Sequence, residues 1–279
     1  MKCLACLTSL IFLLFSGSSA CAQRPIYVIA HRVNDVDTID KALSLGANAV
    51  ECDIRFWRPG GKIEFVVDHD AVVPGHSTKL SDWLVAAKKA AEKHKHFALI
   101  YFDMKVNEID ANAPLELLRQ ARAVLPADFP LIFSTASFEK RAFFDRIKDN
   151  LGPKDGLAID EDKDPDRVQR YFRDELKTKN HWYGYGTFAG GIDRVESYIR
   201  KGIEVRDKEG GIKKVCVWTL ERDSSIERYI KDFQVDALIV NVAHSLPLHS
   251  SPVPSAVKFA NKYGRLATRN DDPFVVYKK

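Results

Sequence analysis

The chain has 279 residues, of which 46% are hydrophobic and 29% charged, and it carries a formal net charge of +4. This is the composition of an ordinary globular protein, and the charge lacks the concentrated basic stripe that nucleic-acid binding requires. The length suits one α/β barrel of ~250 residues better than two small domains. We therefore expect one main domain and no nucleic-acid partner.

Residues 1–22 have the pattern of a secretory signal peptide. Lys2 supplies a positive charge at the start, residues 4–15 form an apolar stretch, and small residues follow it. Cleavage after Ala20 or Ala22 would satisfy the small-residue rule for such signals. We therefore expect a secreted protein.

A membrane anchor and a lipid anchor are the alternatives for this N-terminus. The apolar stretch is too short to span a bilayer. Cys21 is a candidate for bacterial lipid attachment, but Ser18 stands where an aliphatic residue is usual. No later stretch is long and apolar enough to cross a membrane, so we expect no transmembrane segment.

Short apolar runs alternate with helix-like segments through most of the remaining chain. The expected strands are residues 26–30, 49–54, 63–67, 98–104, 131–135, 157–160, 182–186, 214–220 and 237–240. The expected helices are residues 36–45, 80–93, 114–124, 138–149, 165–176, 192–201 and 224–232. Gly46 and Pro114 are typical of a helix end and a helix start, respectively.

This alternation gives roughly eight β-then-α units, which indicates a parallel sheet with helical crossovers. A closed barrel and an open, doubly wound sheet both fit the alternation. No glycine fingerprint or P-loop follows the first strand, which argues against nucleotide binding. The simplest division is a barrel over residues 23–251 and a C-terminal extension over residues 252–279.

Polar side chains lie at the carboxyl ends of several expected strands, where barrel enzymes hold their active sites. These residues are His31, Glu51, Asp53, His69, Asp103, Lys105, Trp218 and Asn241. Each one taken alone has an ordinary structural explanation, because a histidine is usually structural or solvated and a tryptophan usually belongs to the core. Their coincidence at strand ends is the stronger signal.

The pair Glu51 and Asp53 points to a metal ion. Strand alternation places both carboxylates on one face and Cys52 on the other. Two acids in an apolar strand are costly to bury unless a positive charge holds them. Hard oxygen ligands suit Mg²⁺ or Ca²⁺, and Asp103 and Lys105 share one face of another strand end.

His-Arg after the first strand, Glu-x-Asp after the second and a further histidine resemble the glycerophosphodiester phosphodiesterase superfamily. That family usually continues from His-Arg with a Pro-Glu-Asn segment, whereas this chain continues with Val33-Asn34-Asp35.

The chain more closely resembles the sphingomyelinase D / phospholipase D family of spider venoms, actinobacteria and fungi. The resembling stretches are residues 24–34, 45–53, 68–70, 102–105, 217–219 and 240–241. Residues 267–279 resemble the C-terminal motif of that family, which plugs the far end of its barrel and which ordinary glycerophosphodiesterases lack. The resemblance therefore implies a TIM (β/α)8-type barrel with a C-terminal plug.

The resemblance also implies roles for the strand-end residues. It assigns His31 and His69 as the acid/base pair, with His31 as the base that activates the attacking oxygen. It assigns Glu51, Asp53 and Asp103 as Mg²⁺ ligands, and Lys105, Trp218 and Asn241 as substrate contacts. It further implies a monomer that acts on phospholipid at a membrane surface.

The reaction implied is attack of the substrate's own hydroxyl on phosphorus, which releases choline or a similar alcohol and leaves a cyclic phosphate. A glycerophosphodiesterase that uses water and a non-enzymatic membrane-binding toxin are the alternatives. Spider enzymes carry a cysteine pair in the loop after the second histidine, and residues 70–80 of this chain contain none. This places the chain nearer the bacterial and fungal branch. Because Cys52 and Cys216 face opposite ways, we expect no disulfide between them.

Overall fold

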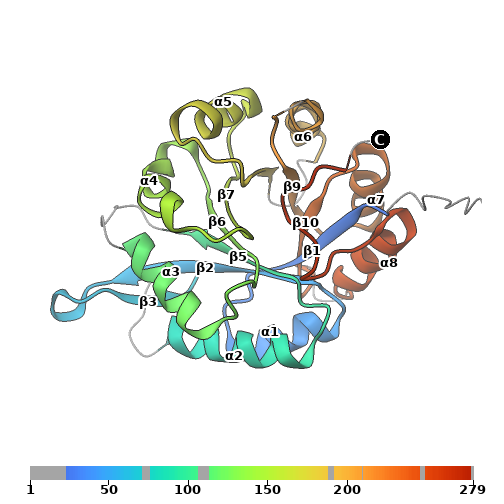
Figure 1. Cartoon of the computed structure of the whole chain (residues 1–279). Helices are drawn as coiled ribbons and strands as arrows, with labels where there is room; N and C mark the ends of the chain where they lie inside the picture. The colour runs from blue at the N-terminus through green and yellow to red at the C-terminus, as the bar shows by residue number, and fades with distance from the viewer. Residues whose placement is uncertain are drawn as a thin grey trace, which may run out of the picture.

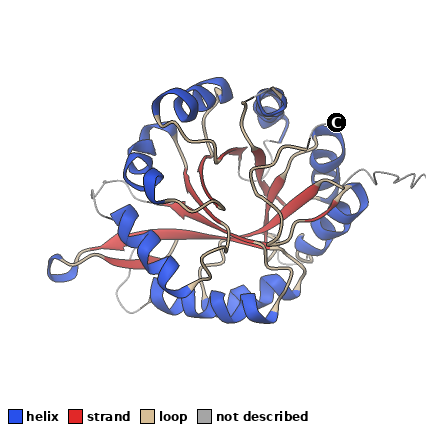
Figure 2. Cartoon of the chain, viewed as in Figure 1, coloured by secondary structure: helices blue, strands red, loops and turns tan. Residues whose placement is uncertain are grey.

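The computed structural model describes residues 23–70, 76–105, 113–187, 192–208, 210–245 and 249–277. The expected signal peptide lies outside these residues, as do the last two residues of the C-terminal extension. Helices surround a ring of strands in the described part of the chain (Figure 1). Figure 2 shows the helices as an outer layer around the strands.

Eight parallel strands of the described residues close into a barrel. In chain order they are β1 (Pro25–His31), β2 (Ala49–Trp57), β5 (Leu99–Met104), β6 (Leu131–Thr135), β7 (Asp155–Ile159), β8 (His181–Gly186), β9 (Lys214–Leu220) and β10 (Ala237–Asn241). Each strand pairs with the next one around the ring, and β1 pairs with both β10 and β2. The predicted TIM-type α/β barrel is therefore confirmed, and the open-sheet alternative is wrong.

The helices pack around this barrel. They are α1 (Val36–Ser44), α2 (Leu80–Lys93), α3 (Ala113–Val124), α4 (Phe144–Ile147), α5 (Pro165–Arg170), α6 (Ile192–Asp207), α7 (Asp223–Arg228) and α8 (Val253–Tyr263). In α1, the buried residues Ile39, Ala42 and Leu43 recur at helical spacing and face the barrel. The helix ends before Gly46, whose φ of 99° suits a residue without a Cβ atom.

Strand alternation divides the buried side chains into two layers. One set fills the barrel interior and includes Tyr27, Tyr101 and Trp182, and the other lies between the strands and the helices. Cys216 belongs to the interior set, whereas Cys52 belongs to the outer set. Both cysteines are free, which confirms the prediction that they do not pair.

The strand expected over residues 63–67 does not join the barrel. It forms β3 (Glu64–Val67), which pairs antiparallel with the far half of β2, and β3 in turn pairs with β4 (Thr78–Lys79). The run is apolar because Phe65 and Val67 pack against the outer layer of the core. Apolar character alone therefore could not distinguish this hairpin strand from a barrel strand.

Two helical regions also differ from the expectation. The segment expected as one helix over 138–149 breaks into 3-10 turns on either side of α4. The helix α8 is absent from the elements expected from the sequence, although it packs against β1 and β10 as the last helix of the barrel.

The segment after α8 contacts the amino-terminal ends of the strands. It begins with β11 (Arg265–Leu266), which pairs with β1. Phe274 lies among the interior side chains, the indole of Trp182 donates a hydrogen bond of 2.9 Å to the Pro273 carbonyl, and Lys214 Nζ donates to the Val275 carbonyl. These contacts hold the described part of the segment against the barrel end opposite the carboxyl ends of the strands.

Asp271 is the carboxylate that organises this segment, and replacing it tests the segment's contribution to stability. Burial opposes ionisation of Asp271, but hydrogen bonds from Arg265 and Thr268 outweigh burial and lower its pKa to about 2. We expect Asp271→Asn to lower the free energy of unfolding by about 1–2 kcal/mol at pH 7.

The pH dependence of this loss follows from the direction of the shift. A depressed carboxyl pKa stabilises the fold above the unfolded value of about 4, and that stabilisation disappears as the pH falls toward 2. Chemical denaturation of the wild type and the variant should therefore give a difference at pH 7 that shrinks below pH 4. Asp232→Asn, at an exposed carboxylate, is the matched control, and equal effects of the two substitutions would contradict the assignment.

Candidate active site

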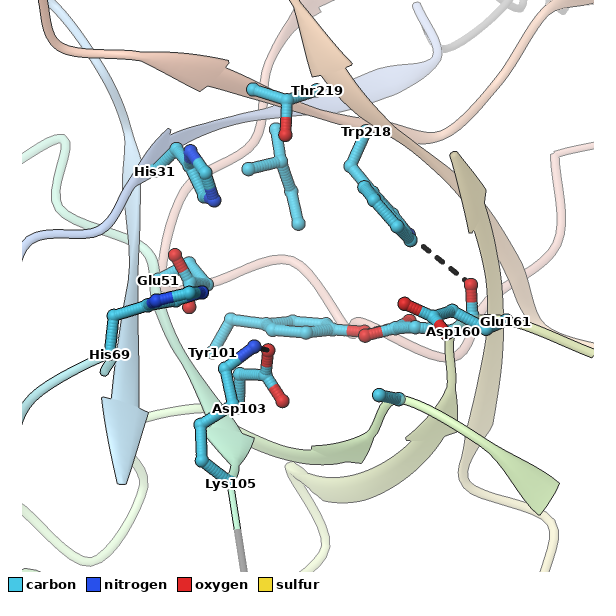
Figure 3. Close-up of a pocket in the computed structure, with 12 residues that line it drawn as sticks. His31, Glu51, His69, Tyr101, Asp103, Lys105, Asp160, Glu161, Trp218 and Thr219 are labelled. Carbon is cyan, nitrogen blue, oxygen red and sulfur yellow. Dashed lines mark hydrogen bonds and ion pairs between the residues drawn. The ribbon is translucent and has the colours of Figure 1, made fainter. Parts of the chain in front are cut away.

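A cavity opens at the carboxyl ends of the barrel strands (Figure 3). Its lining consists of His31, Glu51, His69, Tyr101, Asp103, Lys105, Ala136, Asp160, Glu161, Trp218, Thr219 and Ile239. Figure 3 shows the two histidines on one side of the cavity and Asp160 and Glu161 on the opposite side. Six of the eight residues predicted from strand ends are therefore lining residues of one cavity.

Three carboxylates, two of them buried and one half-buried, form a cluster at this end of the barrel. Glu51 and Asp53 come from β2, and Asp103 lies directly beside Asp53 on the neighbouring strand β5. One ligand atom from each of the three lies within 4.8 Å of the others. Burial first, and then the charges of Asp53 and Asp103, raise the pKa of Glu51 well above its ordinary value. The cluster therefore requires positive charge to remain ionised.

Lys105 supplies part of that charge. Its ammonium lies 2.6 Å from Asp103 and 3.3 Å from Asp53. Burial opposes the lysine charge, but the two aspartates outweigh it and raise the pKa of Lys105. Asp103 Oδ1 is nevertheless buried without a hydrogen-bond partner among the described residues. A third acid and this unpartnered oxygen fit a divalent cation with hard oxygen ligands.

Residues just after β1 hold the carboxylates in place. The backbone N–H of Arg32 donates a hydrogen bond of 2.6 Å to Glu51 Oε2. The side chain of Asn34 donates to Asp53 Oδ2 at 2.8 Å and accepts from the Asp53 N–H at 3.0 Å. Arg32 has a φ of 52°, in the left-handed region that costs energy for a residue other than glycine. This turn therefore orients the carboxylate cluster.

A hydrogen-bond chain fixes the tautomer of His31. Glu221 accepts a hydrogen bond from the Asn241 side-chain amide and two from Ser245, and these bonds lower its pKa although burial opposes them. Because the amide nitrogen faces Glu221, Asn241 Oδ1 faces His31 Nδ1, at 2.6 Å. Nδ1 must then carry the proton, which leaves Nε2 of His31 unprotonated.

Burial also keeps His31 neutral. It lowers the pKa of His31 to about 4, against the opposing effect of the hydrogen bond that His31 Nδ1 donates to Asn241 Oδ1. A neutral imidazole with an unprotonated nitrogen is able to accept a proton near pH 7.

His69 is held between two charged side chains. Its Nδ1 lies 2.6 Å from Asp70, and its Nε2 lies 2.6 Å from the guanidinium of Arg32. Because arginine only donates hydrogen bonds, Nε2 accepts from Arg32 and Nδ1 donates to Asp70. Arg55 donates two hydrogen bonds to the His69 carbonyl, at 2.6 and 3.1 Å, and so fixes its backbone.

The wall opposite the histidines is acidic and aromatic. Burial, followed by the charge of Asp103, raises the pKa of Asp160 to about 7, and the Tyr101 hydroxyl donates to its side chain at 2.6 Å. The same two causes raise the pKa of Glu161. The Trp218 indole donates a hydrogen bond of 3.2 Å to the Asp160 carbonyl, so its ring is fixed beside both carboxyl groups.

The structure brings all eight predicted residues together. Six line the cavity, and the other two contact lining residues: Asp53 contacts Lys105, and Asn241 contacts His31. Their roles in a reaction stay predictions. Sequence reasoning missed several residues that shape the cavity, namely Arg32, Asn34, Asp70, Tyr101, Asp160, Glu161 and Glu221. Asp160 and Glu221 each follow a barrel strand directly, so the rule that found the other residues would also have selected these two.

Similarity to known proteins agrees with the geometry of the cavity. A family model described as Sphingomyelinase D/Phospholipase D matches residues 21–274. The chain belongs to this family. It is therefore an enzyme of the phospholipase D type, which cleaves phosphodiesters, and the non-enzymatic alternative is wrong.

Curated relatives match over nearly their full length. A dermonecrotic toxin of Loxosceles arizonica is 27% identical over 284 residues, which cover 91% of this chain and 95% of the toxin. A sphingomyelinase D of Aspergillus flavus is 26% identical over 283 residues, which cover 90% of this chain and 91% of that protein. The two identities do not separate the spider and fungal branches, so the closer affinity to bacterial and fungal enzymes stays a prediction.

A solved structure of the spore coat polysaccharide biosynthesis protein spsE from Bacillus subtilis shares the barrel fold. The match covers 91% of this chain and 75% of the spsE chain, with a TM-score of 0.55 and 10% sequence identity. At this identity the likeness concerns the fold alone. In the described part of the chain, no helix combines the length and the apolar character needed to cross a bilayer.

Replacing Asn241 tests whether it fixes the tautomer of His31 or contacts the substrate. We expect Asn241→Ala to lower kcat about 10- to 100-fold with little change in KM, because the histidine loses the group that fixes its tautomer. A pure substrate contact would instead raise KM. Steady-state kinetics on a phosphodiester lipid measure both parameters, and Asn180→Ala, at the opposite end of the barrel, should leave them unchanged.

Proposed function

We propose that this protein is a secreted, Mg²⁺-dependent phospholipase D that removes the headgroup from sphingomyelin or lysophospholipids. The observation that carries the proposal is one cavity with two histidines on one side, a carboxylate cluster at its base and an acidic, aromatic wall opposite. The family supports phosphodiester cleavage, and these features support the metal, the proton transfers and the headgroup.

Glu51, Asp53 and Asp103 would hold the metal ion. When bound, Mg²⁺ would neutralise the charge that develops on the non-bridging phosphate oxygens. Lys105 contributes a second positive charge at the same position. The hydrogen bonds from Arg32 and Asn34 hold two of the three carboxylates before any substrate arrives, which keeps the cost of reorganisation low.

His31 acts as the general base in this proposal. Its Nε2 accepts the proton of the substrate hydroxyl as that oxygen forms a bond to phosphorus. Asn241 and Glu221 stabilise the resulting imidazolium, because the chain of hydrogen bonds ends at a carboxylate. This favours His31 over His69 as the base, since Arg32 occupies Nε2 of His69.

His69 acts as the general acid. The bond between phosphorus and the headgroup oxygen breaks, and protonated His69 transfers its proton to that oxygen. For His69 to carry this proton on Nε2, the guanidinium of Arg32 has to leave the nitrogen, and the incoming phosphate is an anion that attracts it. The products are a cyclic phosphate on the lipid and a free alcohol.

The wall formed by Trp218, Asp160 and Glu161 favours a cationic headgroup. An aromatic face and adjacent carboxylates attract a quaternary ammonium group. Choline, the headgroup of sphingomyelin and lysophosphatidylcholine, carries such a group, whereas the headgroup of lysophosphatidylglycerol does not. A lipid at a membrane surface is therefore the proposed partner.

Secretion, the monomeric state and the domain division complete the proposal. The pattern of residues 1–22 supports export, and the contacts of residues 265–277 with the barrel support a tail that closes its amino-terminal end after residue 252. The sequence resemblance supports a monomer.

Phosphorus NMR tests the reaction. We expect sphingomyelin or lysophosphatidylcholine to give a cyclic phosphate with release of choline, and EDTA to abolish turnover until Mg²⁺ is restored. His31→Ala and His69→Ala should each lower kcat about 100- to 10,000-fold, the usual contribution of acid–base catalysis. Calorimetry should show Mg²⁺ binding that Asp103→Asn weakens.

Three outcomes would contradict parts of this proposal. Linear phosphate from glycerophosphocholine alone would favour the hydrolytic glycerophosphodiesterase. Full activity in EDTA would contradict the proposed dependence on a metal ion. Full activity of His31→Ala would contradict the assignment of His31 as the general base.

Glu161 tests the headgroup assignment. We expect Glu161→Gln to raise KM for lysophosphatidylcholine about threefold to fivefold, the effect of losing a charge contact of up to ~1 kcal/mol, without raising KM for lysophosphatidylglycerol. Glu139→Gln, at an exposed carboxylate outside the cavity, is the control. An equal rise in KM for both lipids would contradict the proposal that the headgroup binds beside Glu161.

A further inference from the structure

The hairpin of β2 and β3 extends beyond the helices that surround the barrel (Figure 1). Its last paired residues are Trp57 and Glu64, so residues 58–63 form the turn. A Cβ atom added at Gly60 or Gly61 would meet no atom within 4 Å. The two glycines therefore stand clear of the rest of the described chain, whereas Ile63, at the end of the turn, packs against the outer layer of the core.

This hairpin tip, residues 57–63, is basic and partly apolar. Arg58 and Lys62 are exposed, and Trp57 and Ile63 are half-buried. The tip contains no acid. The nearest carboxylate along the hairpin, Glu64, lies 4.0 Å from Lys79 of β4.

The tip lies on the catalytic side of the molecule. Strand alternation places Trp57 on the same face of β2 as Glu51, Asp53 and Arg55. Arg55 bonds the backbone of His69, so the tip and the proposed general acid belong to one hydrogen-bonded unit. Because β2 runs past Glu51 and Asp53 before it reaches the tip, the tip lies on the side of the barrel at which the cavity opens.

We propose that the hairpin tip docks the enzyme on a lipid bilayer that carries anionic headgroups. Tryptophan sits well at the boundary between headgroups and acyl chains, and basic side chains are attracted to an anionic bilayer surface. This inference rests on the proposed function, because docking brings lipid to the cavity, but binding and catalysis can be measured separately.

Vesicle binding tests the inference directly. We expect the wild-type enzyme with Mg²⁺ to co-sediment with vesicles of phosphatidylcholine and 30% phosphatidylserine that contain no substrate lipid. The double variant R58Q/K62Q should bind about tenfold or more weakly, from a loss of ~1 kcal/mol per basic residue. The difference should disappear in 0.5 M NaCl, because salt screens exposed charges.

The matched control is K88Q/K89Q, which removes two exposed lysines from α2 and should leave vesicle binding unchanged. Turnover of a short-chain lysophosphatidylcholine below its micelle concentration should be the same in all three proteins, whereas turnover of vesicle substrate should fall only in R58Q/K62Q. Trp57→Phe should also reduce the vesicle-induced shift in tryptophan fluorescence.

Absence of wild-type binding to these vesicles, or an equal loss in R58Q/K62Q and K88Q/K89Q, would overturn the docking proposal. Binding that depends on the tip in an enzyme without activity on either lipid form would overturn the proposed function and leave the docking site standing.

Discussion

The active end of this barrel depends on the confinement of three carboxylates beside one lysine. Glu51 and Asp53 are almost fully buried, and their mutual repulsion adds to the cost of taking each charge out of water. Lys105 offsets part of this cost, and a divalent cation would offset the rest. The turn after β1 serves the same cluster, because Arg32 and Asn34 donate hydrogen bonds to two of the acids. The proposed binding of a cation and of phosphate would therefore both depend on one electrostatic requirement.

The sequence revealed much of this arrangement because barrel topology converts strand-end positions into one location. Glu51, Asp53 and Asp103 could be grouped without coordinates, since parallel strands present their carboxyl ends at the same edge. The alternating elements predicted a parallel sheet with helical crossovers, and the family resemblance then favoured the closed barrel over the open sheet. Strand alternation also separated Cys52 from Cys216 correctly.

Other features required the structure because they depend on contacts across the chain. The strand at residues 64–67 is as apolar as a barrel strand, and only its pairing with β2 shows that it leaves the barrel. The tautomer of His31 depends on Glu221, which lies 190 residues further along the chain (221 minus 31). The contact between the Arg32 guanidinium and His69 Nε2 depends on a left-handed backbone conformation at Arg32, which no side-chain pattern predicts. Asp160 and Glu221 were missed although each directly follows a barrel strand and the same strand-end rule applied to them.

The two histidines are supported in different ways, and this difference fits their proposed tasks. His31 ends a barrel strand and is fixed by a half-buried chain of hydrogen bonds that leads to Glu221. A base that must remove a proton from a substrate hydroxyl benefits from one fixed tautomer and a stabilised cation. His69 lies after a hairpin strand outside the barrel, and an exposed arginine and an exposed aspartate contact its ring. An acid must take up a proton in each cycle, so contact with exposed, charged groups suits it better than burial. The same hairpin carries the basic tip, so the proposed docking of a lipid surface and the proposed protonation of the headgroup would use the two ends of one hairpin.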